Sequence, residues 1–268
     1  MKKSETGGKG RENRKEIALV LTPDELERYD RQVLIRDVGQ AGQERLKRAR
    51  IVIAGAGGLG SAVAIYLAAA GVGMIRLIDH DEVKLANLNR QILHWTGDVG
   101  RKKVASATEK LKRLNPWTEL VADDRMITDE NAADFLSGID GVVDALDNIE
   151  TRFLINKAAV DRGIPLFHGA VRAFEGRVMT VIPGKTACLR CVYRGAMHEE
   201  KFPIIGATPA VIGSLQATEV IKYIAGIGTL LTDRFVVYDG LNMSFTELKV
   251  SRNPACPHCA SVNRQGER

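Results

Sequence analysis

A glycine-rich turn between a predicted strand and a predicted helix constrains the fold of this chain more than any other feature. The stretch IVIAGAGGLGSAVAIYLAA sets Gly55, Gly57 and Gly60 in the spacing G-x-G-x-x-G. Such a turn lets backbone N–H groups approach a phosphate, and the helix N-terminus that follows favours an anion. Asp79, at the end of the next predicted strand, is placed to accept hydrogen bonds from ribose hydroxyls. The turn predicts a nucleotide site that fits NAD and adenosine nucleotides equally well; a turn used only for packing is the weaker alternative.

Strands and helices alternate through the middle of the chain. The predicted elements of this core are strands at 50–55, 74–79, 118–123, 141–146 and 165–168 and helices at 59–71, 100–114 and 148–162. This alternation predicts a Rossmann-like α/β fold, a mostly parallel sheet with helices on both faces.

Further elements flank this core on both sides. Thr22, Pro23 and Glu25 form a helix start signal, and 41–49 reads as a second short helix. After the core, the β-branched stretches 176–182 and 234–250 lie on either side of a helix at about 209–225. They predict antiparallel strands that extend the sheet.

The predicted domain organisation is simple. Residues 1–21 are expected to be a disordered basic tail, and 263–268 a short C-terminal tail. Residues 22–262 are expected to form a single domain. Its core would lie at about 50–170 and its antiparallel extension at about 171–262.

Charge and composition exclude several classes of partner. The net charge is +5, but the first 21 residues carry six basic and three acidic side chains and supply much of it. Aromatic residues make up only 5% of the chain, which leaves few stacking platforms, so we expect no nucleic-acid partner. No apolar stretch approaches the roughly 20 residues that span a bilayer, and no secretion signal is visible. We therefore expect a cytoplasmic protein without a membrane partner.

The segment after the second predicted strand carries more positive charge than NAD requires. KLANLNRQILHWTGDVGRKKVASA contains Asn87, Arg90 and Lys103, amide and cationic groups that could clamp a triphosphate of charge about −4. For Arg101–Lys103 the alternative is a solvated basic helix face. The segment as a whole favours ATP chemistry over hydride transfer.

The stretch DALDNIETR ends another predicted strand at the same carboxyl edge of the sheet, where open α/β sheets bind ligands. Asp147 could hold Mg²⁺ there, because Mg²⁺ usually takes one or two carboxylates together with phosphate oxygens. Asp147 and Asn148 could also cap the next helix. The two roles can coexist.

The four cysteines of the chain form two Cys-x-x-Cys pairs: Cys188 with Cys191, and Cys256 with Cys259. Two matched pairs predict a tetrahedral, structural zinc site, and the second pair makes a redox role the weaker alternative. His258 lies between two of the cysteines and is expected to be a bystander. The metal would pin the antiparallel extension to the loop after residue 191.

In their order along the chain these motifs resemble the ubiquitin-activating-enzyme-like adenylyltransferases of the MoeB, ThiF and HesA type, which charge sulfur-carrier proteins. The shared motifs are RYDRQ at 28–32, GAGGLGS, the Asp after the second strand, NLNRQ, DVGRKK, DALDN and the two cysteine pairs. The resemblance runs from about residue 22 to residue 262 and implies that this domain is an adenylation domain.

The resemblance implies a reaction. The C-terminal Gly-Gly carboxylate of a small ubiquitin-like sulfur-carrier protein attacks the α-phosphorus of ATP, which gives an acyl-adenylate and pyrophosphate. The carrier would later become a thiocarboxylate for cofactor biosynthesis, such as that of molybdopterin or thiamin. Because a carboxylate is already ionised, the enzyme needs no general base and has only to position groups and neutralise charge.

The resemblance also implies roles for individual residues and a homodimer. These roles are phosphate contact for Gly58, Arg90 and Lys103, ribose contact for Asp79, Mg²⁺ binding for Asp147, support from Asn87 and Asn148, and a finger from the partner subunit for Arg31. For Arg31 a surface ion pair is the alternative.

Relatives that form a thioester or an acyl disulfide need a further cysteine, and the segment 192–210 contains none. We therefore expect an enzyme that stops at the adenylate and hands it to a separate sulfurtransferase. The same segment is expected to be a mobile cover over the site. An NAD(P)-dependent oxidoreductase and a non-catalytic, zinc-stabilised scaffold that binds the carrier remain alternatives, and adenylation of transfer RNA or of a short peptide ranks lower.

Overall fold

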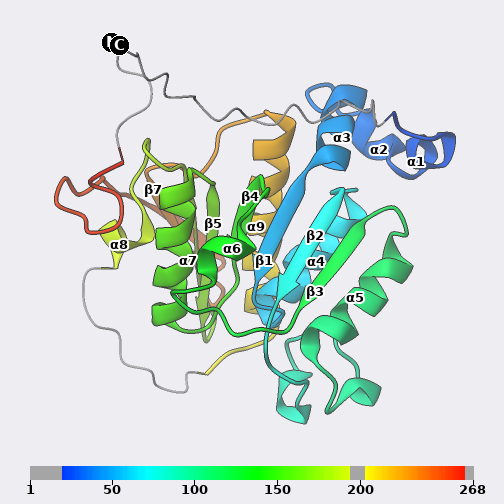
Figure 1. Cartoon of the computed structure of the whole chain (residues 1–268), viewed down its shortest axis with the longest axis horizontal. Coiled ribbons are helices and arrows are strands. Elements are labelled where there is room, and N and C mark those ends of the chain that lie inside the picture. Colours follow the sequence, from blue (N-terminus) through cyan, green and yellow to red (C-terminus); the bar gives the residue numbers. More distant parts are fainter. Residues whose placement is uncertain (1–19, 194–202, 263–268) are drawn as a thin grey trace, which may run out of the picture.

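The structure is a computed structural model that describes residues 20–193 and 203–262. These residues form an eight-stranded sheet with the order β3-β2-β1-β4-β5-β6-β7-β8. The strands are β1 (Arg50–Ala54), β2 (Met74–Ile78), β3 (Glu119–Asp123), β4 (Gly141–Asp144), β5 (Leu166–Arg172), β6 (Glu175–Val181), β7 (Arg234–Asp239) and β8 (Ser244–Lys249). Strands β1 to β5 are parallel, and β6 to β8 continue the sheet antiparallel (Figure 1). The predicted sheet with its antiparallel extension is confirmed.

Helices cover both faces of this sheet; α7 lies in front of the strands in Figure 1 and α9 behind them. The helices are α1 (Pro23–Arg28), α2 (Asp30–Val33), α3 (Gly39–Arg48), α4 (Gly58–Ala69), α5 (Lys103–Leu114), α6 (Ala132–Phe135), α7 (Ile149–Arg162), α8 (Leu189–Val192) and α9 (Ala207–Ala225). Single 3₁₀ turns occur at Leu85–Asn87 and Thr96–Asp98. Within the described residues, none of the helices has both the length and the apolar character needed to cross a bilayer.

The core consists of two layers because successive side chains of a strand point to opposite faces. Along β1, Ile51 and Ile53 pack with apolar residues of α4, α5 and α9, whereas Val52 and Ala54 pack with α6 and α7 on the other face. All four side chains are fully buried. The continuous apolar run of β1 thus follows from its central place in a sheet that is covered twice.

The strand order sets the place for a ligand. β1 lies between β2 and β4, and the chain crosses from one side of β1 to the other between β3 and β4. In open α/β sheets such a switch point leaves a crevice at the carboxyl ends of the two central strands. The glycine turn follows β1 and the loop with Asp147 follows β4, so both lie at this edge.

Some predicted boundaries are wrong, each for a physical reason. The helix predicted at 100–114 begins only at Lys103, because Lys102 pairs with Glu82 in an isolated antiparallel bridge. The strand predicted at 165–168 continues to Arg172, because β6 pairs with it over its whole length, beyond the three residues that pair with β4. The stretch 234–250 contains two of the expected antiparallel strands, β7 and β8, which pair as a hairpin.

The N-terminal boundary also lies earlier than predicted. Leu21 is buried, and Lys47 donates a hydrogen bond to the carbonyl of Val20, so the folded part begins before residue 22. The capping box of Thr22 and Glu25 is confirmed, but two short helices, α1 and α2, replace the single predicted one. Most of the predicted tails, and residues 194–202 of the predicted cover, lie outside the described residues.

Candidate functional site

Of the three glycines in the G-x-G-x-x-G spacing, packing requires two and does not require the third. Gly55 has φ +100°, and a Cβ there would lie 2.6 Å from the carbonyl oxygen of Ala145. A Cβ on Gly60 would lie 1.9 Å from the carbonyl oxygen of Gly55. A Cβ on Gly57 would meet nothing closer than the side chain of Gln91 at 3.6 Å, an ordinary contact. Since packing would tolerate a side chain at Gly57, the glycine there fits a backbone that a ligand must approach closely.

Asp79 and Lys103, two predicted site residues, meet beside this turn. Asp79 accepts a hydrogen bond from the backbone N–H of Ala56 at 2.8 Å, which ties the end of β2 to the turn. The ammonium of Lys103 lies 3.6 Å from Asp79 and 2.8 Å from Asp81. Burial opposes ionisation of Asp81, but the hydrogen bond from Lys103 still holds its pKa below the usual range. The structure thus gathers two carboxylates and a buried ammonium at the switch point.

Arg90 reaches the same edge through its backbone. The position of a Cβ on Gly58 is 3.4 Å from the carbonyl oxygen of Arg90, so the two segments pack together. Its guanidinium donates to the carbonyl of Ala86 at 2.9 Å and to the side-chain oxygen of Asn89 at 3.0 Å. Asn87 accepts a hydrogen bond from the backbone N–H of Lys84 and shapes the same loop. In this conformation the polar groups of both predicted residues therefore serve their own loop.

Arg101 and Lys102 differ from their neighbour Lys103. Arg101 forms ion pairs with Asp98 and Glu109, and Lys102 lies 3.5 Å from Glu82. Both side chains are 43% exposed, whereas that of Lys103 is 7% exposed. Arg101 and Lys102 thus lie at the surface, as the alternative of a basic face expected, but they precede α5 instead of lying on it, and only Lys103 turns inward.

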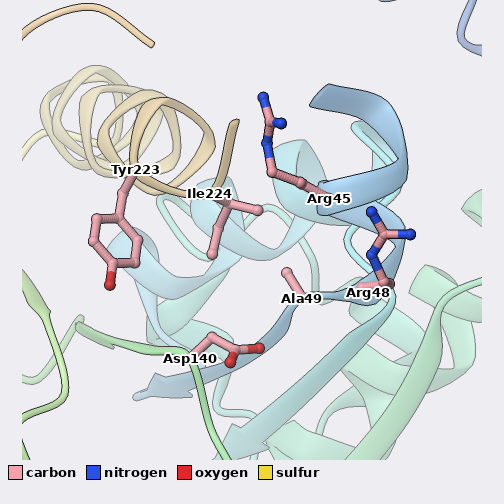
Figure 2. Close-up of a pocket in the computed structure, with 6 residues that line it drawn as sticks. All are labelled: Arg45, Arg48, Ala49, Asp140, Tyr223 and Ile224. Carbon is pink, nitrogen blue, oxygen red and sulfur yellow. The ribbon is translucent and has the colours of Figure 1, made fainter. Parts of the chain in front are cut away.

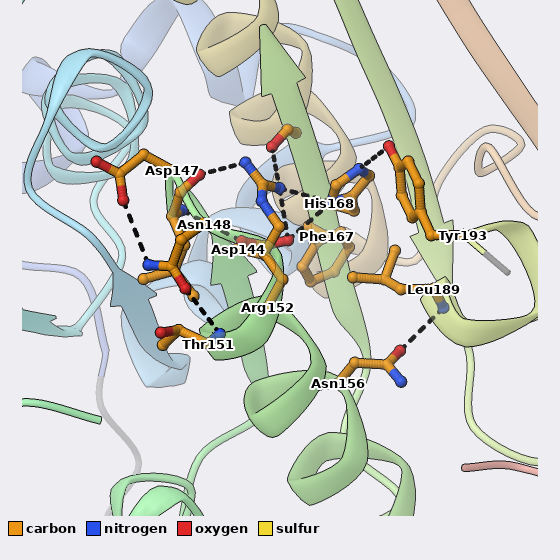
Figure 3. A network of polar contacts seen from close by, with 12 residues as sticks. Asp144, Asp147, Asn148, Thr151, Arg152, Asn156, Phe167, His168, Leu189 and Tyr193 are labelled. Carbon is orange, nitrogen blue, oxygen red and sulfur yellow. Dashed lines mark hydrogen bonds and ion pairs between the residues drawn. The ribbon is translucent and has the colours of Figure 1, made fainter. Parts of the chain in front are cut away.

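Asp147 and Asn148 follow β4. The side-chain oxygen of Asn148 accepts a hydrogen bond from the backbone N–H of Thr151 at 2.8 Å, so Asn148 is the N-cap of α7. Asp147 is exposed, and its nearest side-chain partner is the amide of Asn148 at 3.4 Å (Figure 3). Capping thus falls to Asn148 and leaves the carboxylate of Asp147 available at the edge of the sheet.

Asp144, only three residues before Asp147, is fully buried and belongs to a different arrangement. Arg152 donates a hydrogen bond to its carboxylate at 2.9 Å and to the carbonyl of Gly169 at 2.7 Å, and it also contacts the carbonyl of Leu146 (Figure 3). Burial opposes ionisation, but the charge of Arg152 and a hydrogen bond from His168 hold the pKa of Asp144 below its usual range. Asp144 therefore supports the loop before Asp147 and is not available to a ligand at the edge.

His168 completes this buried network. Its Nδ1 lies 2.7 Å from the carboxylate of Asp144 and 3.1 Å from the guanidinium of Arg152. Its Nε2 lies 3.1 Å from the hydroxyl of Tyr193. Burial lowers the pKa of His168, although Asp144 acts in the opposite direction. The network thus links the sheet to the segment that follows the first cysteine pair.

Arg31 lies on α2 and is exposed. Within residues 20–193 and 203–262 it makes no hydrogen bond or ion pair, so the alternative of a surface ion pair is not observed for this side chain. The apolar side chains of Leu34 and Ile35 next to it are 66% and 54% exposed. Arg31 therefore does not join the other predicted residues within one chain.

The four cysteines meet in a buried cluster that could hold a metal ion. The sulfur of Cys188 lies 4.0 Å from that of Cys191 and 3.6 Å from that of Cys256, and Cys191 lies 3.5 Å from Cys259. These distances are far too long for disulfides. A tetrahedron of four sulfurs, each about 2.3 Å from a central zinc, has edges of about 3.8 Å. The cluster therefore fits a tetrahedral metal centre.

His258 stands beside this cluster and outside its set of ligands. Its Nδ1 lies 2.8 Å from the side-chain amide of Asn156, and its ring packs edge-on against Phe153. The oxygen of Asn156 in turn accepts a hydrogen bond from the backbone N–H of Leu189. His258 thus helps to fasten the cysteine cluster to α7, as expected for a bystander.

A pocket of about 480 Å³ lies at the opposite edge of the sheet. Ala49 and Asp140, which directly precede β1 and β4, form its floor, and Arg45, Arg48, Tyr223 and Ile224 of α3 and α9 complete it (Figure 2). None of the predicted site residues lines this pocket. Its position at the amino ends of the strands separates it from the glycine turn.

Sequence reasoning missed several residues that shape the site. Arg152 fixes the loop before Asp147, and Gln216 of α9 donates to the carbonyls of Asp144 and Phe167 at the ends of β4 and β5. His94 lies under the glycine turn and contacts the carbonyl of Ala56. Arg152 ends the stretch DALDNIETR and His94 lies in the segment between Arg90 and Lys103, but no spacing in either marks the residue as a support; Gln216 belongs to no motif.

Comparison with known proteins identifies the family. Residues 29–258 match the ThiF family. The chain is 43% identical over 257 residues to the sulfur carrier protein adenylyltransferase of Thermus thermophilus. This match covers 92% of this chain and 95% of that protein. It is 38% identical to the SAMP-activating enzyme E1 of Haloferax volcanii, with 91% and 92% covered. It is also 39% identical to the adenylyltransferase and sulfurtransferase MOCS3 of Mus musculus, but spans only 54% of that protein.

A solved structure agrees with these matches. The crystal structure of E. coli MccB with ATP superposes with a TM-score of 0.80 at 26% identity and covers 87% of this chain and 75% of that one. The matches decide between the two nucleotide chemistries that the glycine turn left open. The chain belongs to the ThiF family and is an adenylyltransferase.

Proposed function

We propose that this enzyme transfers the adenylyl group of ATP to the C-terminal Gly-Gly carboxylate of a small ubiquitin-like sulfur-carrier protein. The observation that carries the proposal is the meeting of Asp79 and Lys103 beside the turn at Gly57. Binding of the ribose and the α-phosphate of a nucleotide uses three groups: an acceptor for the ribose hydroxyls, a cation for the phosphate, and a backbone that the phosphate can approach. The names of the relatives from Thermus thermophilus and Haloferax volcanii support a protein carrier as the acceptor.

In this proposal each group at the edge has one task. Asp79 accepts hydrogen bonds from the ribose hydroxyls, and the backbone at Gly55, Gly57, Gly58 and Gly60 receives the phosphates. Lys103 and Arg90 neutralise the charge that develops on the phosphates, with Arg90 leaving its contacts inside its own loop. Asn87 and Asn148 support this arrangement through their loop and cap contacts.

Asp147 suits a magnesium ion, because it is an exposed carboxylate at the edge where the phosphates would lie. Mg²⁺ held there would supply positive charge that offsets the charge of the phosphates. The cap role of Asn148 leaves this carboxylate free for that task.

The chemical step needs no proton transfer from the protein. A carboxylate oxygen of the carrier attacks the α-phosphorus, a new P–O bond forms, and the bond from the α-phosphorus to the bridging oxygen breaks. The bond electrons leave with pyrophosphate, and the products are the acyl-adenylate and pyrophosphate. The protein contributes orientation and charge neutralisation, which are terms of several kcal/mol in such reactions.

We further infer that the four-cysteine cluster holds a structural zinc ion and that the enzyme acts as a homodimer. The sulfur spacing and the backbone hydrogen bond from Asn253 to the sulfur of Cys191 support a thiolate-bound metal. The exposed apolar residues beside Arg31 support a partner subunit, to whose site Arg31 would contribute a guanidinium.

Pyrophosphate exchange into ATP tests this function. Purified enzyme is incubated with ATP, Mg²⁺, labelled pyrophosphate and one of several Gly-Gly carriers, each beside a copy without its last glycine. We expect exchange with at least one intact carrier and none with its shortened copy. The absence of exchange with every intact carrier would overturn the assignment of a protein acceptor.

The product is expected to leave as an adenylate, because all four cysteines lie in the cluster. A separate sulfurtransferase would then convert it to the thiocarboxylate. Intact-mass spectrometry of the enzyme after reaction with ATP and the active carrier tests this expectation. A covalent adduct of enzyme and carrier that a thiol reverses would contradict it.

A further inference from the structure

A buried polar chain lies directly beneath the glycine turn. His94 is 3% exposed, and its Nε2 lies 2.9 Å from the carbonyl oxygen of Ala56, the residue between Gly55 and Gly57. Its Nδ1 lies 2.9 Å from the hydroxyl of Ser106, which is fully buried. A single histidine thus joins the turn to the start of α5.

The chain continues behind Ser106. Lys110 donates to the Ser106 hydroxyl at 2.9 Å and lies 2.5 Å from the carboxylate of Asp98. Asp98 also accepts from the backbone N–H of Trp95 at 2.7 Å and from Arg101 at 2.8 Å. The side chains of Asp98 and Lys110 are 6% and 8% exposed, so their geometry is fixed from several directions.

The chemistry of the partners sets the protonation of His94. A carbonyl oxygen only accepts, so Nε2 must carry a proton and donate to Ala56. Ser106 receives a hydrogen bond from Lys110 and can donate its own proton to Nδ1. Burial lowers the pKa of His94, and the nearby ammonium groups of Lys103 and Lys110 act in the same direction. The imidazole is therefore neutral in a single tautomer.

This contact determines the direction of a backbone donor. The carbonyl of Ala56 and the N–H of Gly57 belong to one planar peptide and point in opposite directions. His94 holds the carbonyl of this peptide, and Asp79 holds the N–H of Ala56 in the preceding peptide. The peptides on both sides of Ala56 are therefore restrained. Among the described residues the N–H of Gly57 has no acceptor, and it lies at the position that precedes α4.

We propose that His94 is a positioning residue that holds the Ala56–Gly57 peptide so that the N–H of Gly57 faces the phosphates of the nucleotide. This inference rests on the proposed function. It means that His94, a residue outside the glycine motif, supports the conformation of the glycine turn. Ser106, Lys110 and Asp98 act through His94 by holding its ring. The segment ILHWTGD thus supports the glycine turn, whereas Lys103, which follows it, neutralises phosphate charge.

Two substitutions of similar size separate the two bonds of His94. In His94→Gln the terminal amide nitrogen can replace Nε2 and keep the bond to Ala56, whereas in His94→Asn the shorter side chain can keep only the bond to Ser106. Calorimetric titration of the full chain with the α,β-methylene analogue of ATP, and separately with adenosine, measures the effect on phosphate binding. We expect His94→Asn to bind the analogue about tenfold more weakly than the wild type and adenosine equally well, and His94→Gln to stay within about threefold.

The outcomes separate this inference from the proposed function. Equal affinity of His94→Asn and the wild type for the analogue, or equal losses for the analogue and adenosine, would overturn the role of His94 alone. A wild-type enzyme that binds neither ATP nor its analogue would overturn the proposed function itself. Should His94→Asn fail to fold, Ser106→Ala takes its place: we expect about threefold weaker analogue binding with adenosine unchanged, and an unchanged analogue affinity would overturn the proposal.

Discussion

The ammonium of Lys103 lies 3.6 Å from the carboxylate of Asp79, and that carboxylate also accepts the backbone N–H of Ala56. A cation, the end of β2 and the glycine turn are therefore joined at one point of the sheet. Arg101 and Lys102, the basic neighbours of Lys103, do not share this setting: their side chains are 43% exposed and pair with Asp98, Glu109 and Glu82. The proposed adenylation chemistry depends on the ammonium of Lys103, which alone among these three neighbours is buried beside the glycine turn.

Substitution of Lys103 tests the dependence directly. We expect Lys103→Ala to lower the rate of pyrophosphate exchange by about 100-fold or more, because the group that neutralises the phosphates is lost. Lys102→Ala is the matched control: its side chain is 43% exposed and pairs with Glu82, so the rate should stay within about threefold of the wild type. Equal exchange rates for the two variants would contradict the assignment of Lys103 to the site.

The buried pair of Asp98 and Lys110 predicts a pH-dependent stability. Burial opposes ionisation of Asp98, but the hydrogen bond from Lys110 lowers its pKa from 3.8 to about 2. A group with a lowered folded-state pKa stabilises the protein above its unfolded pKa, and this contribution of about 2 kcal/mol is lost as the pH falls from about 4 to about 2.

Urea unfolding of Asp98→Asn across this range checks the prediction. At pH 7 the variant should be less stable by about 3 kcal/mol, because Lys110 is left buried without its partner. The difference from the wild type should shrink below about pH 4, where the wild-type carboxyl takes up its proton. Asp161→Asn, which removes an exposed pair with Lys157, should change stability by less than about 0.5 kcal/mol. A constant difference at all pH values would contradict the assigned pKa.

We expect Arg152 to be essential for stability, so that even its conservative replacement by Lys destabilises the protein. Arg152→Ala leaves the fully buried carboxylate of Asp144 without its cation, and we expect a loss of about 3–5 kcal/mol of unfolding free energy. Arg152→Lys should also be destabilising, by about 1–3 kcal/mol, because one ammonium cannot replace a guanidinium that reaches Asp144 and two carbonyls. Thermal and urea unfolding measure both. Exposed Arg162 on the same helix is the control, and a loss no larger than that of Arg162→Ala would contradict the network.

The cysteine cluster predicts one zinc ion per chain by plasma mass spectrometry. Cys256→Ser should lose the metal and lower the melting temperature by about 10 °C or more, since about 3–5 kcal/mol corresponds to such a shift in a chain of this size. His258→Ala should keep the metal, because its ring contacts Asn156 and Phe153 and lies outside the cluster. Loss of zinc from His258→Ala, or its retention in Cys256→Ser, would contradict the proposed ligand set.

The parts of the site that the sequence predicted depend on short-range rules. The spacing of Gly55 and Gly60 follows from a turn in which a Cβ would clash, and Asp79 follows from the end of the next strand. The two cysteine pairs predicted a cluster although they lie far apart in the sequence, because two matched Cys-x-x-Cys pairs are typical of a single metal site. The sheet itself followed from the alternation of apolar strands and helices.

The remaining parts depend on tertiary packing that no local pattern encodes. Arg101, Lys102 and Lys103 are all basic in the sequence, and only Lys103, which follows the bridge between Lys102 and Glu82, turns inward to Asp79 and Asp81. Asp144 lies in the same stretch DALDNIETR as Asp147, but Arg152, eight positions further along the chain, is buried against it. The separation of three residues between Asp144 and Asp147 gave no sign that one is buried and the other exposed.

A crystal structure with Mg²⁺ and the α,β-methylene analogue of ATP tests the central claim most directly. We predict a ribose within hydrogen-bond distance of Asp79, an α-phosphate against the N–H of Gly57, and Lys103 and Arg90 directed at the phosphates, with the metal on Asp147. A nucleotide bound elsewhere, or one whose phosphates point away from Lys103 and Arg90, would contradict the account.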